Sequence, residues 1–338
     1  MIYVHVPFCK SFCVYCDFYS ELDCGDNSAI RNYSLQLQNE ALRRKEEILE
    51  SAGTNTLYIG GGTPSLMPLP FFEDLLKSLP LSEFEEFTVE MNPDDVLKRG
   101  KDFLLPLKEL GVNRISMGVQ SLDDKSLKWM RRRHDSACAL KAYELLRECG
   151  FDNISLDLIF GISADASLEK TLKGFIALHP EHISAYQLSI EEGSALHAKM
   201  EMGLYKPLED EKCSEQYHFI CSELNKAGYT HYEISNWALP GKEAIHNSAY
   251  WSRKPYVGLG PGAHSLRFLS DNQQIRSWNS NKLQNWESDS ESLTSEEIRE
   301  ESIMLGLRRK EGVIVDGRHL QIPEEKWFIA DSIIADLI

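Results

Sequence analysis

The 338-residue sequence lacks the features that would place it in a membrane or on a nucleic acid. No apolar run approaches the roughly 18 residues of a membrane-spanning helix, so no transmembrane segment is expected. The first residues, MIYVHVPFCKSFC, have no basic stretch ahead of an apolar one, so no signal peptide is expected. Basic residues are the minority, 36 against 52 acidic ones, and the formal charge of −16 repels phosphate backbones. These absences predict a cytoplasmic protein without a nucleic-acid partner.

What the chain does contain is typical of a globular protein with a metal or redox function. Hydrophobic residues make up 42% of the sequence and charged residues 26%, which is enough apolar material for a large core. The chain also has eight cysteines. Disulfides are rare in the cytoplasm, where clustered cysteines more often bind a metal or take part in redox chemistry.

Strand-like and helical patterns alternate through the first part of the chain. Short runs rich in Val, Ile, Tyr and Thr predict strands at Ile2–Val6, Thr56–Gly60, Phe87–Met91, Arg114–Val119, Asn153–Ile159 and His182–Leu188. Helical spacing between them predicts helices at Ser28–Glu50, Asp95–Leu110, Asp123–Cys149 and Ser167–Leu178. Such alternation is typical of parallel strands joined by crossover helices. The expected fold is α/β, a partial (β/α)6 barrel of the TIM type, although an open doubly wound sheet fits the pattern too.

The alternation stops near residue 203. We therefore expect a barrel at residues 1–203 and a smaller α+β extension at residues 204–338, which contains a helix at Asp210–Ala227 and a strand at Tyr229–Ile234.

The later part of this extension is polar. The stretch Leu269–Ser295 is rich in Ser, Asn, Gln and Asp and predicts mostly loop, anchored by Trp278 and Trp286. Thr294 and Glu297 form a capping-box pattern that predicts a helix directly after it.

Three cysteines follow the first strand within eight residues, as Cys9-x-x-x-Cys13-x-x-Cys16. Thiolates on one loop can bind a single soft-metal centre, and a four-iron cluster held by only three of them would keep one iron open to a small molecule. A structural zinc site completed by His5 or Cys24 fits the same spacing, and so do three unrelated buried thiols. The four cysteines that fall in helical patterns predict ordinary core positions: Cys138, Cys149, Cys213 and Cys221.

Glycine and polar residues stand at the ends of the following strands. The run Gly60-Gly61-Gly62-Thr63 would let a ligand approach the backbone closely. Glu90, Gln120 and Asp157 end three successive strands, at the rim where a parallel barrel builds its site. A plain glycine turn and internally satisfied caps are the alternatives. Arg132 lies in a basic run, which is usually a solvated helix end.

Two further motifs lie in the C-terminal region. The segment His246-Asn247-x-x-Tyr250-Trp251 places an imidazole beside two aromatic rings, which suits an axial haem ligand, although a lone histidine is more often structural. The segment Gly258-x-Gly260-x-x-Ala263 matches a dinucleotide fingerprint only superficially, because Pro261 interrupts it and no helical pattern begins there.

Taken together, these motifs resemble a known family over nearly the whole chain. The segments YVHVPFC with its three cysteines, GGGTPS, EMNPD, SMGVQS, SLDLIFG, YQLSIE, HNSAYW and YVGLGPGAHS resemble the radical S-adenosylmethionine (SAM) proteins. Within them the chain is similar to the oxygen-independent coproporphyrinogen III oxidase-like family, and to its HemW haem-chaperone subgroup. The resemblance implies a radical SAM partial barrel.

The same resemblance implies cofactors and the residues that hold them. Cys9, Cys13 and Cys16 would bind three irons of a [4Fe-4S] cluster, and SAM would bind the fourth. Eight residues align with positions that contact SAM in the family: Tyr3, Gly61, Gly62, Thr63, Glu90, Gln120, Arg132 and Asp157.

One departure within the family decides between two functions. The oxidases carry a further cysteine two residues after the third, whereas this chain has Phe18, which the HemW-like members share. The resemblance therefore favours a haem chaperone with His246 as the haem ligand, delivering haem to a respiratory protein that could be membrane-associated. The alternative is an oxygen-independent coproporphyrinogen III oxidase, an activity that Phe18 argues against. The chain could form a homodimer, and its end at Ile338 predicts an incomplete C-terminal cap.

Overall fold

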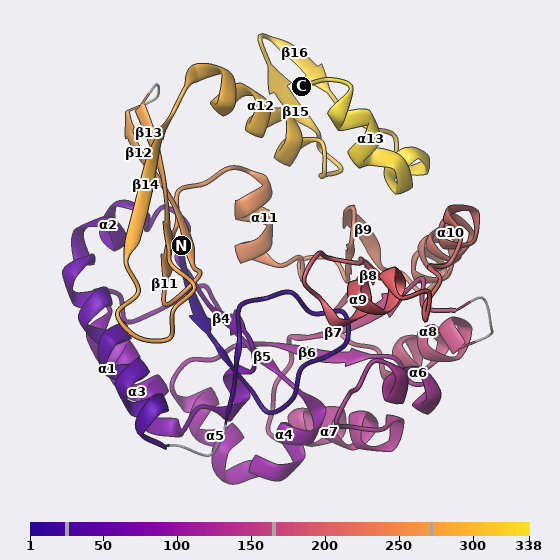
Figure 1. Cartoon of the computed structure of the whole chain (residues 1–338), viewed down its shortest axis with the longest axis horizontal. Coiled ribbons are helices and arrows are strands. Elements are labelled where there is room, and N and C mark those ends of the chain that lie inside the picture. The colour runs from indigo at the N-terminus through magenta and orange to yellow at the C-terminus, as the bar shows by residue number, and fades with distance from the viewer. Residues whose placement is uncertain (24–26, 164–166, 271–272) are drawn as a thin grey trace.

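The computed structural model describes residues 1–23, 27–163, 167–270 and 273–338. Within these residues, nine strands form one sheet in the order β11-β1-β4-β5-β6-β7-β8-β10-β9. Neighbouring strands are parallel from β11 through β8, and the crossover helices lie along the outside of the curved sheet (Figure 1). The α/β partial barrel predicted from the sequence is confirmed.

The six predicted strands form at the predicted places, with ends that differ by at most one residue. Their bounds are β1 Ile2–Val6, β4 Thr56–Gly61, β5 Glu86–Met91, β6 Arg114–Gln120, β7 Ile154–Phe160 and β8 His182–Gln187. The helix at Ser167–Leu178, α8, also has the predicted bounds.

Three predicted helices are each divided in two. The pairs are α1 Asn27–Arg43 with α2 Lys45–Glu50, α4 Pro93–Arg99 with α5 Lys101–Glu109, and α6 Asp124–Trp129 with α7 Ser136–Glu148. Gly100 separates the second pair with a φ of +63°, a left-handed conformation that ends a helix. The shorter elements of the barrel are β2 Phe8–Cys9, β3 Glu21–Leu22, η1 Pro64–Leu66, α3 Leu69–Ser78 and α9 Ala195–Glu201.

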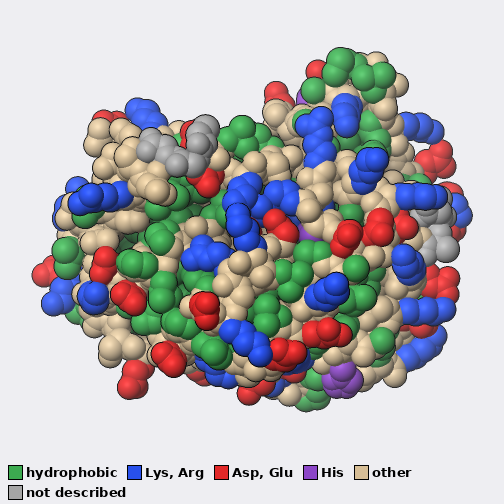
Figure 2. Space-filling view, turned by 90° about the horizontal axis from the view of Figure 1, so that it is seen from below, with side chains coloured by type: hydrophobic (Ala, Val, Ile, Leu, Met, Phe, Trp, Pro, Cys, Tyr) green, Lys and Arg blue, Asp and Glu red, His purple; other side chains and the backbone are tan. Residues whose placement is uncertain are grey.

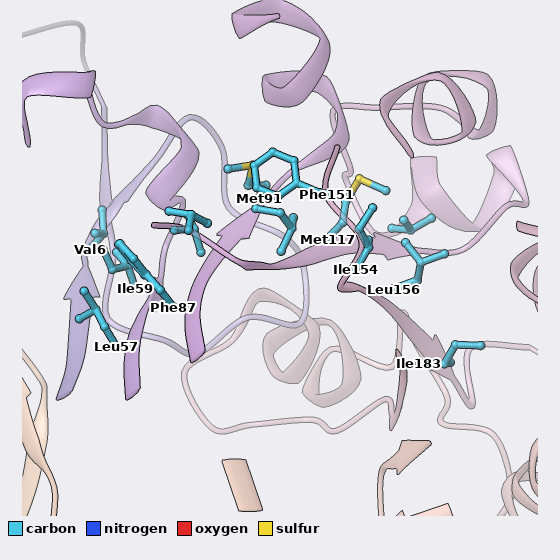
Figure 3. Packing of buried hydrophobic residues seen from close by; sticks show 14 of the residues in the cluster. Val6, Leu57, Ile59, Phe87, Met91, Met117, Phe151, Ile154, Leu156 and Ile183 are labelled. Atoms are coloured by element: carbon cyan, nitrogen blue, oxygen red, sulfur yellow. The ribbon is translucent and has the colours of Figure 1, made fainter. Parts of the chain in front are cut away.

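Successive side chains of the barrel strands point to opposite faces, and the two faces differ in polarity. The outer face packs under the helices and is apolar, as the side chains of Leu57, Ile59, Phe87 and Met117 show in Figure 3. The inner face carries the residues between these positions, including Tyr58, Glu90, Arg114, Ser116 and Asp157, which line a cavity. The inner face is therefore polar enough to need a polar ligand or internal partners.

Residues after 203 complete the barrel sheet. Helix α10, Asp210–Lys226, precedes β9, Thr230–Glu233, and β10, Asn236–Ala238, which extend the sheet beyond β8. Strand β11, Val257–Leu259, pairs in parallel with β1 at the opposite edge. Between these strands lies α11, Ile245–Trp251.

The polar stretch predicted as loop is a second sheet, so that prediction was wrong. Strands β12 His264–Ser270, β13 Gln273–Asn279 and β14 Ser288–Leu293 pair in antiparallel order. Strand β14 is exposed at all but its last residue, so backbone pairing, and not an apolar face, holds it in place. The capping box of Thr294 and Glu297 forms and begins α12, Ser295–Gly306. The chain ends in β15 Val313–Val315, β16 Arg318–Leu320, η2 Glu324–Ile329 and α13 Ala330–Ala335.

The outer surface mixes charges of both signs. On the face in Figure 2, Lys and Arg side chains lie among Asp and Glu side chains. None of the helices in the described ranges is both long enough and apolar enough to cross a membrane.

One buried carboxylate joins the first helix to the C-terminal strands. Glu40 of α1 accepts hydrogen bonds from the backbone N–H of Gly260 at 2.9 Å, from Asn279 Nδ2 at 2.8 Å and from Trp286 Nε1 at 2.9 Å. Glu40 is only 1% exposed and also pairs with Arg44 at 3.3 Å, so it is the shared acceptor of this buried cluster. Trp286 thus serves as the anchor that the sequence predicted.

We predict that Glu40→Ala lowers the free energy of unfolding by about 3 kcal/mol, because three buried donors lose their acceptor. Denaturant titration measures this. The matched control is Glu46→Ala on the exposed side of α2, which should stay within about 0.5 kcal/mol of the parent. Equal losses in the two variants would contradict the anchoring role of Glu40.

Candidate functional site

A large cavity opens at the end of the barrel where the parallel strands finish. It encloses about 700 Å³, and we call it cavity 1. The residues predicted to hold the cluster and SAM line it, except Tyr3: Cys9, Cys13, Cys16, Gly61, Gly62, Thr63, Glu90, Gln120, Arg132 and Asp157. The structure therefore brings together residues that are up to 148 positions apart in the sequence (157 − 9).

Cys9 ends β2, and Cys13 and Cys16 lie on the loop between β2 and β3, which crosses in front of the barrel strands in Figure 1. All three thiols are free and partly buried. Burial raises the pKa of Cys9, and it raises the pKa of Cys16 to about 11. Thiols in this setting stay protonated at neutral pH unless a cation or metal stabilises the thiolate.

In the described ranges, no three His, Cys, Asp or Glu side chains already stand close enough to hold one metal ion. Three thiols are one fewer than the four protein ligands usual in a structural zinc site, whereas each of them could bind a different iron of a cubane. His5, one proposed fourth zinc ligand, uses both ring nitrogens in hydrogen bonds to Tyr3 and Tyr19, and Cys24 lies outside the described residues.

The glycine run after β4 is pressed against the cysteine loop. A Cβ atom on Gly62 would stand 2.7 Å from the Phe8 carbonyl oxygen and 3.0 Å from Cys9 Sγ. Gly61 has a φ of +106°, and a Cβ there would stand 2.6 Å from His5 Nδ1. Only glycine fits either position, so the run brings the backbone close to Cys9 and leaves the cavity wall free of side chains.

Two carboxylates face the cavity from the inner side of the barrel. Glu90 accepts hydrogen bonds from Tyr58 Oη at 2.7 Å and from Gly61 N–H at 3.1 Å, and burial raises its pKa to about 7. Asp157 accepts from the hydroxyls of Ser116 at 3.1 Å and Ser155 at 3.2 Å, and burial raises its pKa as well. Both acids would be stabilised in their charged form by donors or a positive charge from a ligand.

Gln120 and Arg132 are held in place by unusual local structure. Gln120 ends β6 in a left-handed conformation, with a φ of +67°, next to a register shift between β6 and β7. Such strain persists where the surrounding structure enforces it, and it is common at functional sites. Arg132 donates to Asn92 Oδ1, to the Gly118 carbonyl and, at 3.4 Å, to Cys13 Sγ, so its guanidinium lies at the cluster end of the cavity.

The two remaining predicted residues, Tyr3 and His246, line a second cavity, which we call cavity 2. It encloses about 570 Å³ between the cysteine loop, β1, α11 and the start of β12. The two cavities share four lining residues, which are Asp17, Phe18, Tyr58 and Asn247. Tyr3 nevertheless lies close to Glu90, since its ring centroid is 6.1 Å from that of Tyr58, which donates to Glu90, and burial and the nearby Glu90 both raise the pKa of Tyr3.

His246 is enclosed and fully hydrogen-bonded. Its Nδ1 lies 2.8 Å from Thr56 Oγ1, and its Nε2 lies 3.2 Å from Tyr250 Oη. Burial lowers its pKa to about 3, so the ring is neutral at physiological pH. A neutral imidazole is the form that binds a metal, but one of the two hydrogen bonds must open first.

Several functional residues were missed by the sequence analysis. Tyr58, Asn92 and Arg114 line cavity 1, and Asn92 also donates to Thr63 Oγ1 at 3.3 Å. The period-2 alternation of the strands could have identified Tyr58 and Arg114, since they share the inner face with Glu90 and Ser116. Nothing in the local pattern indicates Asn92, whose role depends on Arg132, 40 residues later.

The fold and the cysteine loop define a radical SAM protein, and residues 3–173 match the model of the radical SAM superfamily. The haem chaperone HemW of Lactococcus lactis is 34% identical over 93% of this chain and 83% of its own length. HemW of Escherichia coli is 36% identical over 81% of this chain and 72% of its own length. The chain therefore belongs to the radical SAM superfamily and, within it, to the HemW family.

A solved structure supports the fold. The radical SAM enzyme coproporphyrinogen III oxidase, HemN, from Escherichia coli superposes with a TM-score of 0.79 over 99% of this chain and 88% of its own. Its sequence is only 18% identical, so this likeness establishes the architecture alone.

The raised pKa of Glu90 predicts a pH dependence of stability. The folded protein keeps this proton up to about pH 7, whereas the unfolded chain releases it near 4.5, so stability falls as the pH rises between these values. Replacing the acid by Glu90→Gln removes this contribution. The unfolding free energy of the variant relative to the parent should rise by up to about 3 kcal/mol from pH 4.5 to 7.5. Parallel curves in chemical denaturation across this range would contradict the assignment.

Proposed function

We propose that this protein is a haem chaperone that carries a SAM-ligated [4Fe-4S] cluster and delivers haem to a respiratory acceptor protein. The relatives named HemW support the haem-chaperone part of the proposal. The observation that carries it is the pairing of two adjoining cavities, one lined by the three cysteines and the other by histidines and tyrosines.

In cavity 1, Cys9, Cys13 and Cys16 each bind one iron of the cluster. The backbone of Gly62, close beside Cys9, keeps this side of the cavity open to the ligand of the fourth iron. Arg132 donates to Cys13 Sγ at 3.4 Å and so brings a positive charge next to this cluster ligand. A cluster with bound SAM supplies one-electron chemistry, and the protein fixes where the two groups stand.

The remaining residues of cavity 1 bind SAM by complementary charge. Glu90 and Asp157 are buried acceptors, so they suit the amine and ribose hydroxyl donors of SAM. Gln120 adds an amide at the end of β6, and Arg132 suits the methionine carboxylate. Gly61, Gly62 and Thr63 present backbone and hydroxyl groups to the methionine end. Tyr3 lines cavity 2 beside Tyr58, which lines both cavities and donates to Glu90, so Tyr3 stands at the edge of the SAM site.

Cavity 2 would hold the haem, and His246 would bind its iron once the hydrogen bond to Tyr250 opens. The volume of about 570 Å³ is in the usual range for a small-molecule site. Aromatic side chains provide flat, apolar walls, including Tyr3, Tyr58 and Tyr256. Phe18, which is 66% exposed, lies at the border of both cavities and can cover one face of a porphyrin.

The cluster assignment predicts the outcome of single cysteine changes. Anaerobic reconstitution of Cys13→Ser should lower the iron and sulfide content and the cluster absorbance, because a hydroxyl replaces the thiolate ligand. Cys138→Ser is the matched control, since its thiol is also partly buried but lies on α7 and does not line cavity 1, and it should keep the full iron content. Full iron content in Cys13→Ser would contradict the ligand set.

The function itself predicts haem binding without porphyrinogen oxidation. The reconstituted protein should bind haemin saturably at one equivalent and should pass it to a haem-free acceptor protein. With SAM and a reductant it should not convert coproporphyrinogen III to protoporphyrinogen IX. Absorption titration follows the binding, and chromatography of the porphyrins follows the turnover. Turnover would replace the chaperone function by that of the oxidase.

A further inference from the structure

Three histidines line cavity 2, and they differ in whether their ring nitrogens are free. They are His5, His246 and His264. His5 uses Nδ1 toward Tyr3 Oη at 3.0 Å and Nε2 toward the Tyr19 carbonyl at 2.8 Å. His246 is likewise engaged at both nitrogens. Two of the three rings therefore have no lone pair available without rearrangement.

His264 is different. It begins β12, directly after the turn at Gly260–Ala263, and it is exposed at the border of cavity 2. Neither of its ring nitrogens has a hydrogen-bond partner among the residues that the structure describes. Its ring faces that of Trp278 at a centroid distance of 6.3 Å and an interplanar angle of 29°, which limits its orientations. Partial burial and the nearby Arg276 lower the pKa of His264, so it is neutral at physiological pH.

A haem iron needs an imidazole nitrogen with an accessible lone pair. We propose that His264 binds the iron of haem in cavity 2 and provides the ligand at the exposed side of the site. This inference rests on the proposed function, since it names a further residue of the haem site. It assigns a metal-binding role to a residue of the GPGAHS segment rather than of the HNSAYW segment.

The exposed position of His264 suits the exchange of haem. A ligand at the open border can form its bond to iron before haem is fully enclosed, and it can be replaced by a ligand of the acceptor protein. His246 is 1% exposed and is restrained by Thr56 and Tyr250, so it reaches the iron only after haem has entered. Haem bound through both histidines would show a low-spin spectrum.

The test uses the full chain reconstituted with its cluster, and haemin as the probe. The parent, His264→Ala, His246→Ala and the control His218→Ala are titrated, and absorption and electron paramagnetic resonance report the spin state. His218 is an exposed histidine beside an aromatic ring, Tyr217, and it lines neither cavity. Circular dichroism and thermal unfolding check that each variant is folded.

We expect low-spin haem in the parent and in His218→Ala, and high-spin haem with a Kd raised about tenfold in His264→Ala. Added imidazole should restore the low-spin spectrum of His264→Ala by occupying the vacated position. An unchanged spectrum and Kd in folded His264→Ala would overturn the role of His264 while leaving the haem chaperone intact. Failure of the parent to bind haemin saturably would overturn the proposed function and this inference together.

Discussion

The structure depends on the opposite polarity of the two faces of one parallel sheet. The outer face buries Val, Ile, Leu and Phe under helices, and this apolar contact forms most of the core. The inner face carries polar groups such as Glu90, Arg114 and Asp157, which are shielded from bulk water. Arg114 is 1% exposed, and its Nε has no hydrogen-bond partner among the described residues. Buried groups of this kind are stable only with partners: Glu90 and Asp157 accept from hydroxyl groups and Arg114 lies 4.0 Å from Glu86, and a polar ligand would add further partners.

A second buried charge sets where the cysteine loop lies. Asp95 of α4 accepts from Lys10 at 3.0 Å and from Arg133 at 2.7 Å, and it is 1% exposed. Burial opposes its ionisation, but these two cations hold the pKa of Asp95 below its ordinary value. Lys10 follows Cys9 in the chain, and Arg133 follows Arg132. One carboxylate therefore fixes both the thiol loop and the arginine that lies beside Cys13.

The sequence predicted best what depends on local pattern. The six barrel strands follow from β-branched runs, and the candidate residues at the strand ends meet because parallel strands finish at one rim. Strand β14 was missed because backbone pairing holds it while five of its six residues are exposed, so its sequence shows no hydrophobic alternation. The sequence predicted Tyr3 on the first strand but could not show that its ring packs beside Tyr58, a residue that lines both cavities.

The two cavities are linked by side chains that belong to both. Tyr58 donates to Glu90 at 2.7 Å on the side of cavity 1, and its ring centroid lies 5.1 Å from that of His246 on the side of cavity 2. A change in the charge or position of Glu90 therefore acts on a ring that packs against His246. Phe18 lies at the same border with most of its side chain exposed. A flat ligand that covered this exposed ring would remove its apolar surface from water, which accounts for an aromatic side chain at the border between the two cavities. A cysteine at position 18 would place a thiol on the side of the cluster. Its small side chain would give a flat ligand no aromatic surface to cover.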